Sequence, residues 1–355
     1  MEETNDDLRI TDGLPHPEDY TQQSLRPRTL ADYIGQEHVR ENLRVMMEAA
    51  KGRGDVLEHV LFSGPPGLGK TTMAHIIASE MGAEFTTTSG PALERSGDLV
   101  SILTGLSQGD VLFIDEIHRM NRVVEETLYP AMEDFTVDIV IGKGPGAKSI
   151  KLTLEPFTLV GATTRSGLLT APLRERFGAV YHLELYPVDA LIKIVHRSSA
   201  IIGVAMTSDA EAEVAKRSRG TPRVANRLLK RVRDFAQIEQ LNMVDGNFVD
   251  WSLGKLGVDA LGLDRMDHRI LDTVAVKFEG GPVGIETLVA VLGEERDTLS
   301  DVYEPYLLQI GFLVKTPRGR MATRAAYDYL GVPYPEELMQ RTKLTEDESQ
   351  ALFNE

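Results

Sequence analysis

The sequence of 355 residues contains no cysteine and only one tryptophan, and it has no long apolar run. Without cysteine, disulfides and thiolate zinc sites are excluded, which fits a reducing compartment. No apolar stretch reaches the roughly 18 residues that a membrane-spanning helix needs. The first residues, MEETNDDLRITDG, are acidic and polar, unlike a secretory signal with its basic start and apolar core. We therefore expect a cytoplasmic protein with no membrane segment.

The sequence also has fewer basic than acidic residues, with 38 lysines and arginines against 54 aspartates and glutamates, a formal net charge of −16 and a pI near 5.0. This balance argues against a protein that coats nucleic acid with its whole surface, but it leaves room for a local basic face. One local exception is KTPRGRMATRAAYDYL, residues 315–330, where Lys315, Arg318, Arg320 and Arg324 fall close together with no acid among them. From this stretch alone, a solvated hairpin tip and a nucleic acid contact are equally compatible with the charge.

The pattern of apolar residues changes twice along the chain. Short apolar strands alternate with helical patterns up to about residue 183, which is typical of a parallel sheet covered by helices. Amphipathic helices follow, and then helices that lead into a strand–turn–strand ribbon, the outline of a winged helix-turn-helix. The expected organisation is an acidic tail at 1–20, a large α/β domain at 21–186, a small all-α lid domain at 187–258, a winged-helix domain at 259–337 and a second tail at 338–355.

The segment GPPGLGKT, residues 64–71, fits the pattern G-x-x-x-x-G-K-[ST] between a predicted strand and a predicted helix, which is the context of a phosphate-binding P-loop. Glycines such as Gly67 and Gly69 let backbone N–H groups approach phosphates, and the helix start adds its positive dipole end. Lys70 is expected to reach the β- and γ-phosphates, Thr71 to ligate Mg²⁺, and Thr72 to reach the α-phosphate.

The segment VLFIDEIH supplies a second part of the nucleotide site. Four apolar residues end in Asp115 and Glu116, so both carboxylates are expected at the carboxyl edge of the sheet beside the P-loop. Asp115 is a candidate Mg²⁺ holder through water, and Glu116 a candidate base that orients the attacking water. Thr164, at the tip of the strand FTLVGATT, is a further candidate for contact with that water or the γ-phosphate. His118 has no supporting pattern, and we interpret it as structural.

Residues 135–157 predict an inserted hairpin. Val137, Ile139 and Ile141 alternate before a turn rich in glycine, and three apolar residues alternate after it. Packing of this ribbon on the main sheet and an exposed apolar docking face are both open from the sequence.

The motifs GPPGLGKTT, FIDEIHRM, GATTRSGLLTAPLRERFG and GTPRVANRLLKRVRDFA resemble those of the AAA+ ATPase family. Together with LRPRTLADYIGQE, TSGPALERSGDL and TPRGRMAT, they are similar more narrowly to the RuvB family of Holliday junction branch migration motors, over roughly residues 20 to 340. The resemblance implies an AAA+ P-loop ATPase domain, its helical lid and a winged-helix head, with ATP and Mg²⁺ as cofactors.

The same resemblance implies roles for single residues that the bare spacing does not give. Arg176 is similar to the arginine finger that completes a neighbouring subunit's site, with Arg174 as a rival; Arg223 is similar to the second sensor and Thr164 to the first. Further implied nucleotide contacts are Leu25, Arg26, Glu133, Asp134, Phe135 and Tyr186.

As partners, the resemblance implies a homo-hexameric ring, double-stranded DNA and four-way junctions, RuvA docked through the 135–157 hairpin, and the RuvC resolvase. It matches Arg296, Lys315 and Arg320 to DNA contacts, with Arg318 as a helper. Two other functions are weighed against the motor. One is a non-motor AAA+ ATPase, such as a clamp-loader subunit or protein remodeller, and the other is a winged-helix regulator that only senses nucleotide. Glu116 argues against pure sensing because a sensor needs no hydrolytic base.

Overall fold

The computed structural model describes residues 25–141 and 148–335. The two expected tails and the turn of the 135–157 hairpin therefore lie outside the described residues. The described chain divides into two compact units, each treated by itself below. The first runs to Gly203 and includes Gly220–Arg223, and the second holds Val204–Arg219 and the chain from Val224 onward. Within these described ranges, no helix combines the length and apolar character needed to cross a bilayer.

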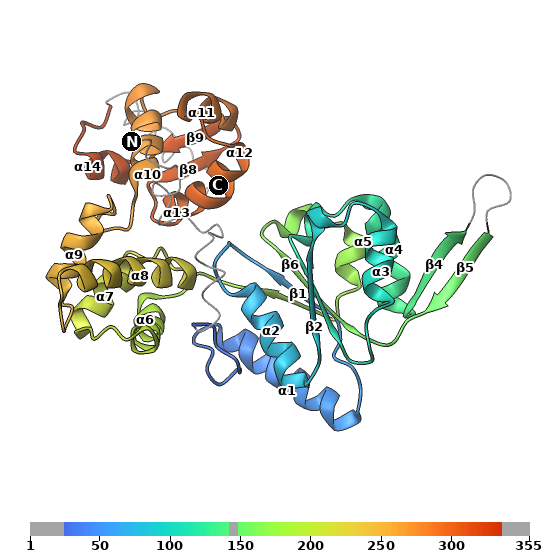
Figure 1. Cartoon of the computed structure of the whole chain (residues 1–355). Helices are drawn as coiled ribbons and strands as arrows, with labels where there is room; N and C mark the ends of the chain where they lie inside the picture. Colours follow the sequence, from blue (N-terminus) through green and yellow to red (C-terminus); the bar gives the residue numbers. More distant parts are fainter. Residues whose placement is uncertain (1–24, 142–147, 336–355) are drawn as a thin grey trace, which may run out of the picture. The chain divides into compact units, whose positions relative to one another are not determined.

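The first unit is built on a sheet of five parallel strands in the order β2-β3-β6-β1-β7 (Figure 1). The inner strands β3, β6 and β1 are almost entirely buried, because helices cover both faces of the sheet. The strands are β1 (Val60–Ser63), β2 (Phe85–Ser89), β3 (Val111–Asp115), β6 (Thr158–Thr163) and β7 (Ala179–His182). The main helices are α1 (Glu37–Arg53), α2 (Lys70–Met81), α3 (Ser96–Leu103), α4 (Arg122–Glu133), α5 (Ala171–Glu175) and α6 (Val188–Ile202).

The parallel α/β architecture that the alternating pattern predicted is confirmed. One strand has no clear apolar pattern and was not predicted: the edge strand β7, which has four residues and alternates between partly buried and exposed positions. Since β1, β3 and β6 run in the same direction, their carboxyl ends meet at one edge of the sheet. The segments that follow these ends carry the P-loop, the acidic pair and Thr164.

The predicted hairpin is present as β4 (Thr136–Ile141) and β5 (Lys148–Thr153), which pair antiparallel and project from the unit (Figure 1). Its apolar residues do not form one exposed face. Val137 is fully buried at the base of the ribbon, within the same core as Leu154. Farther out, Ile139 pairs across the strands with Ile150, which is 45% exposed. The hairpin thus combines both interpretations, with a packed base and an apolar surface beyond it.

The second unit contains lid helices and a winged-helix arrangement. Its own hydrophobic core gathers residues from Leu263 to Tyr327 around the helices and the ribbon β8–β9. The elements of this part are α7 (Ser208–Lys216), α8 (Pro222–Ile238, which begins in the first unit), α9 (Gly246–Lys255), α10 (Arg265–Asp272), η7 (Thr273–Lys277), α11 (Ile285–Leu292), α12 (Arg296–Thr298), η8 (Leu299–Tyr303), α13 (Glu304–Gln309), β8 (Leu313–Thr316), β9 (Gly319–Ala322) and α14 (Arg324–Leu330). The helices and strand–turn–strand ribbon confirm the expected winged-helix outline.

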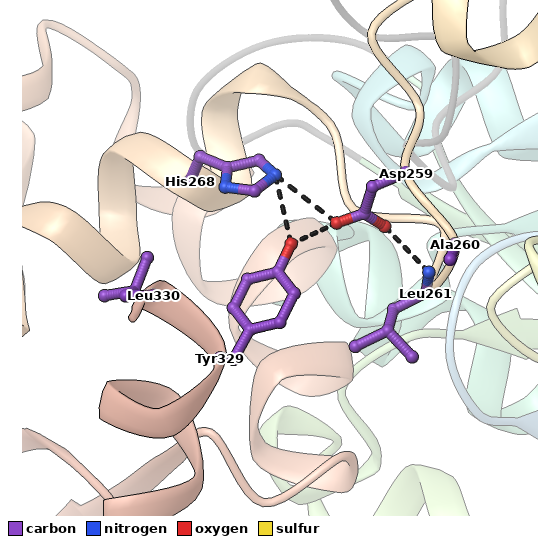
Figure 2. A pocket seen from close by; sticks show the side chains of 6 residues that line it. All are labelled: Asp259, Ala260, Leu261, His268, Tyr329 and Leu330. Carbon is purple, nitrogen blue, oxygen red and sulfur yellow. Dashed lines mark hydrogen bonds and ion pairs between the residues drawn. The ribbon is translucent and has the colours of Figure 1, made fainter. Parts of the chain in front are cut away.

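The turn at residues 259–263 joins the lid helices to the winged helix and is fixed by side chains. The carboxylate of Asp259 accepts hydrogen bonds from the backbone N–H groups of Leu261 and Leu263, each at 2.8 Å. On its other oxygen it accepts a hydrogen bond from the Tyr329 hydroxyl, and His268 Nε2 lies 3.4 Å away at the edge of a pocket (Figure 2). Residues of α10 and α14 therefore hold the entrance to the winged helix in place.

A buried ion pair reinforces the same junction. Arg219, with a side chain 4% exposed, donates from Nε to the Gly262 carbonyl at 2.7 Å, and its Nη2 pairs with the fully buried Asp267. Replacing Asp267 with asparagine is expected to lower the free energy of unfolding by about 3–5 kcal/mol, because it removes the nearer carboxylate of the buried guanidinium and leaves only Asp264, at 3.7 Å, to compensate the charge. Denaturant titration followed by the fluorescence of Trp251, on α9 of the same unit, measures this loss.

The matched control is Asp328→Asn, the same substitution in the same unit at an exposed pair. Arg324 and Asp328 are 4.0 Å apart and more than 70% exposed, so this change is expected to cost less than about 1 kcal/mol. Equal losses in the two variants would contradict the importance assigned to the buried pair.

Candidate nucleotide and DNA sites

The P-loop connects β1 to α2 and encloses the Lys70 side chain. Its Nζ donates hydrogen bonds to the carbonyls of Gly64 at 2.7 Å and Pro65 at 2.9 Å, and the residue is 7% exposed. Burial lowers the pKa of Lys70 to about 8; the carboxylates of Asp115 and Glu116 oppose this shift. The lysine, the two acids and Arg223 therefore share one electrostatic environment, as a nucleotide site requires.

ATP affinity is expected to be flat below about pH 8 and to fall at higher pH, by up to about tenfold per unit. The reason is that the nucleotide-free protein loses the Lys70 proton near pH 8, whereas bound phosphates favour the charged amine, so binding takes up a proton above that pH. Titration with ATP between pH 7 and 9.5 measures the change. Lys70→Arg is the control, because arginine stays charged and any residual affinity should not vary with pH. An affinity that stays constant to pH 9.5 would refute the assignment.

At two positions of the loop, a positive φ and close neighbouring atoms leave room only for glycine. At Gly69, φ is +100° and an added Cβ would lie 2.5 Å from the Tyr33 hydroxyl. At Gly67, φ is +83° and an added Cβ would lie 3.1 Å from the Cβ of Arg223, whose backbone N–H donates to the Gly67 carbonyl at 3.4 Å. The loop is thus packed against Tyr33 on one side and against the start of α8 on the other.

The acidic pair lies at the end of β3, with Asp115 as its last residue and Glu116 directly after it, and it is close to Thr164, as the sequence placed it. The Thr164 hydroxyl donates to Glu116 Oε2 at 3.1 Å, and Asp115 Oδ1 accepts from the Glu116 N–H at 3.0 Å. Glu116 has φ +46°, a left-handed conformation that is uncommon outside glycine and often marks a functional site. The Glu116 carbonyl packs closely against Gly90, since a Cβ added to Gly90 would lie only 2.4 Å from that oxygen. Glycine in the segment TSGP, residues 88–91, therefore leaves room for the Glu116 backbone.

The donor groups at this edge fit a magnesium ion. Thr71 lies in the first turn of α2 and Asp115 at the end of β3, and both offer oxygen, the ligand that Mg²⁺ prefers. Magnesium usually keeps several waters and takes substrate phosphates as further ligands, so two protein groups suffice. Thr72 lies beside Thr71 at the helix start, where backbone N–H groups can meet phosphate.

Three further residues implied to contact the nucleotide, Tyr186, Leu25 and Arg26, each have neighbours within the first unit. Tyr186 donates to the Tyr33 hydroxyl at 2.8 Å, and Tyr33 donates to the Leu68 carbonyl of the P-loop at 3.1 Å. Burial raises the pKa of Tyr186 to about 12, so it remains a neutral donor. Leu25 is 3% exposed, and its carbonyl accepts from Arg197 of α6 at 2.8 Å. Arg26 lies near His75 of α2, whose pKa is lowered by burial and by that guanidinium.

Arg176 caps the end of α5 and contacts α4 and its own helix. Its guanidinium lies 4.3 Å from the centre of the Tyr129 ring, pairs with Glu133 at 3.1 Å and donates to the Pro172 carbonyl at 2.6 Å. Glu133, Asp134 and Phe135 are consecutive at the end of α4, so the structure groups Arg176 with the first of them. Arg174 is exposed on the same short helix.

The basic wing differs from the expectation at one residue. Lys315 and Arg320 are cross-strand neighbours in β8 and β9, and Lys315 and Arg318 are exposed. Arg320, however, is only 8% exposed and donates to the Glu304 carboxylate from Nε at 2.9 Å and from Nη2 at 2.7 Å. The charge of Arg320 is therefore compensated within the domain, and its contact with DNA stays a prediction. Arg296 is 66% exposed, and its Nε lies 3.5 Å from Glu286.

Sequence reasoning did not name Tyr33 or Arg197, and it interpreted His118 as structural. The hydrogen-bond partners of Tyr33 and Arg197 are far away in the chain, so no local sequence motif predicts these contacts. His118 stood next to the acidic pair, but its contact with Thr163, at 2.9 Å, comes from a strand 45 residues downstream.

Comparison with known proteins agrees with the three parts of the chain. The family model described as the Holliday junction DNA helicase RuvB P-loop domain matches residues 25–183. The RuvB AAA lid domain matches residues 186–259, and the RuvB C-terminal winged helix domain matches residues 260–331.

Individual relatives agree with these matches over nearly the whole chain. A Holliday junction branch migration complex subunit RuvB from Chloroflexus aurantiacus is 56% identical over 338 residues, which is 94% of this chain and 95% of the relative. The solved Thermotoga maritima RuvB branch migration motor is 51% identical, with a TM-score of 0.81 over 88% of this chain and 100% of that one. A mutant of that protein aligns with a TM-score of 0.83 over the same shares. The chain therefore belongs to the RuvB family of Holliday junction DNA helicases.

Proposed function

We propose that this protein is the ATP-hydrolysing motor subunit of a Holliday junction branch migration complex. The observation that carries the proposal is the arrangement around Glu116, whose carboxylate accepts from Thr164 beside a complete P-loop, in a chain that also has a winged-helix domain. Relatives that align with 94% and 88% of this chain are named as a branch migration complex subunit and a branch migration motor. A cytoplasmic location is part of the same proposal.

In the proposed hydrolysis, Lys70 binds the β- and γ-phosphates and Glu116 orients and deprotonates the attacking water. Thr164 holds the Glu116 carboxylate from the end of the neighbouring strand. Arg223, whose backbone is fixed to the P-loop at Gly67, serves as the second sensor. A magnesium ion held by Thr71 and, through water, by Asp115 would supply charge neutralisation at the phosphates.

The site is proposed to be completed by a second copy of the chain in a homo-hexameric ring. Arg176 and the neighbouring residues Glu133, Asp134 and Phe135 form one surface of the subunit, and we place this surface against the nucleotide of the next subunit. The ion pair with Glu133 keeps the guanidinium extended along α4 until a γ-phosphate competes for it. In such a head-to-tail ring, each arginine serves its neighbour's site.

The hairpin β4–β5 is the proposed docking site for RuvA, the junction-binding partner. Its outer part pairs Ile139 with the exposed Ile150, an apolar contact on a projecting ribbon. The RuvC resolvase is the further proposed partner, because it would act on the junction that the motor moves.

Duplex DNA is proposed to contact the wing through phosphate groups, which suits a motor that must pass over any sequence. Lys315 and Arg318 are the principal contacts because both are exposed, with Arg296 as a third. Arg320 stays among the proposed contacts, but the Glu304 carboxylate compensates its charge and should weaken its attraction to a DNA phosphate.

The double variant Lys315→Ala/Arg318→Ala is expected to bind duplex DNA more weakly and to reduce the slope of log affinity against log salt by roughly 2. Its basal ATP hydrolysis should be unchanged, since neither residue belongs to the nucleotide unit. Equilibrium binding to a fluorescent duplex between 50 and 200 mM salt measures the slope. Lys277→Ala, at an exposed position in the same domain, is the control and should leave the slope intact. A double variant with the wild-type slope would remove the wing from the DNA contact.

A further inference from the structure

The side chain of His118 reaches the candidate catalytic carboxylate. His118 belongs to the single helical turn η4 (Ile117–Arg119) that follows β3, and its side chain is 5% exposed. Its Nδ1 lies 3.2 Å from Glu116 Oε2 and 2.9 Å from Thr163 Oγ1. A buried imidazole nitrogen thus stands between the tip of β6 and the glutamate that follows β3.

The ionised carboxylate of Glu116 indicates the direction of this contact, because it can only accept a hydrogen bond from Nδ1. Thr163 is fully buried, and its hydroxyl oxygen accepts from the Arg165 backbone N–H at 3.0 Å. A protonated Nδ1 can donate towards this oxygen and towards Glu116 Oε2 together. Since a carboxylate can only accept when ionised, the neutral tautomer with hydrogen on Nδ1 satisfies both partners.

Two donors therefore converge on the same oxygen of Glu116. The Thr164 hydroxyl approaches Oε2 to 3.1 Å from β6, and His118 approaches it from η4. The left-handed backbone of Glu116 turns η4 back, and its carbonyl accepts from the Arg119 N–H at 2.9 Å. This short turn brings a residue two positions after Glu116 into contact with its carboxylate.

We propose that His118 is a positioning residue for Glu116, holding Oε2 together with Thr164 so that Oε1 is presented to the attacking water. His118 acts only through Glu116 and does not touch the nucleotide. This inference rests on the proposed role of Glu116 in ATP hydrolysis. Without His118, Thr164 alone restrains the carboxylate, and the base occupies its productive orientation for a smaller share of the time.

The test compares two amide substitutions that place the NH₂ group differently. The amide nitrogen of His118→Asn occupies the position of Nδ1, whereas that of His118→Gln occupies the position of Nε2. In steady-state ATP hydrolysis, His118→Gln is expected to lower kcat on the order of 10- to 100-fold with less than about twofold change in KM, and His118→Asn is expected to recover most of the rate. A residue that only fills space would be replaced at least as well by the longer glutamine.

Coupling to Glu116 supplies the second readout. Adding His118→Gln to Glu116→Gln should cause little further loss in single-turnover hydrolysis, because the base that His118 positions is already absent. Thermal unfolding of each variant shows whether the fold is kept.

The inference is overturned if asparagine and glutamine at position 118 give equal rates, if KM rises in step with the loss of kcat, or if the losses from His118→Gln and Glu116→Gln multiply. If the wild-type protein hydrolyses no ATP, the proposed function itself is wrong. If the wild type hydrolyses ATP and Glu116→Gln does not, while the variants at 118 match the wild type, only the role of His118 is wrong.

Discussion

Replacing Glu116 with glutamine is expected to lower the rate of ATP hydrolysis by roughly 10²–10⁴-fold while ATP still binds. Glutamine keeps the shape of the side chain and can still accept from Thr164, but it cannot take a proton from water. Lys70 and the P-loop remain intact, so affinity for ATP should change little. Phosphate release and equilibrium ATP binding, measured on the same preparation, separate the two effects.

Glu126→Gln is the matched control for this prediction. Glu126 is an exposed residue of α4 that pairs with Arg122, and the same substitution there should leave turnover unchanged. If Glu116→Gln turned over ATP as fast as the wild type, Glu116 would lose the role of base, and with it the present account of the site.

Replacing Arg176 with alanine is expected to reduce turnover by roughly 10³–10⁵-fold, as arginine fingers do in other phosphoryl-transfer enzymes. The guanidinium neutralises charge that develops on the transferred phosphoryl group, so its loss should affect hydrolysis and spare ATP binding within the subunit. Arg174→Ala serves as the comparison, because Arg174 is the exposed rival on the same helix. If Arg174→Ala gave the larger loss, the two roles would be exchanged.

Mixing subunits tests whether Arg176 acts on a neighbour. A Glu116→Gln subunit has an intact finger and an Arg176→Ala subunit has an intact base, so each is inactive alone. When equal amounts of the two variants mix randomly in rings, about a quarter of the interfaces join an intact base to an intact finger. Turnover should therefore reappear on mixing. Absence of any recovery, with ring assembly confirmed, would place Arg176 within its own subunit's site.

The sequence was sufficient for features that follow from local patterns. Apolar runs predicted β1, β3 and β6, and the P-loop spacing predicted the phosphate site, because glycine, lysine and threonine must occur at fixed steps around a phosphate. The acidic pair was located correctly since it directly follows an apolar strand. Even the winged-helix ribbon was visible as two short strands around a turn at Pro317 and Arg318.

Features that depend on distant partners were not predictable in this way. In the sequence Arg320 looked like Lys315, and only the fold shows that Glu304 pairs with its guanidinium. In the hairpin, alternation identified the apolar residues but could not tell Val137, buried in the core, from Ile150, which is exposed. Nor does anything beside His118 in the sequence reveal that Thr163 lies against it.

The central claim is that ATP hydrolysis at the Glu116 site moves four-way junctions. The most direct measurement follows a synthetic Holliday junction with homologous arms, in the presence of RuvA, magnesium and ATP, as it separates into duplex products. We expect the wild-type protein to produce these duplexes with ATP and Glu116→Gln to bind the junction and ATP without producing them. Junction migration by Glu116→Gln at the wild-type rate, or rapid ATP hydrolysis by the wild type with no migration, would contradict the account.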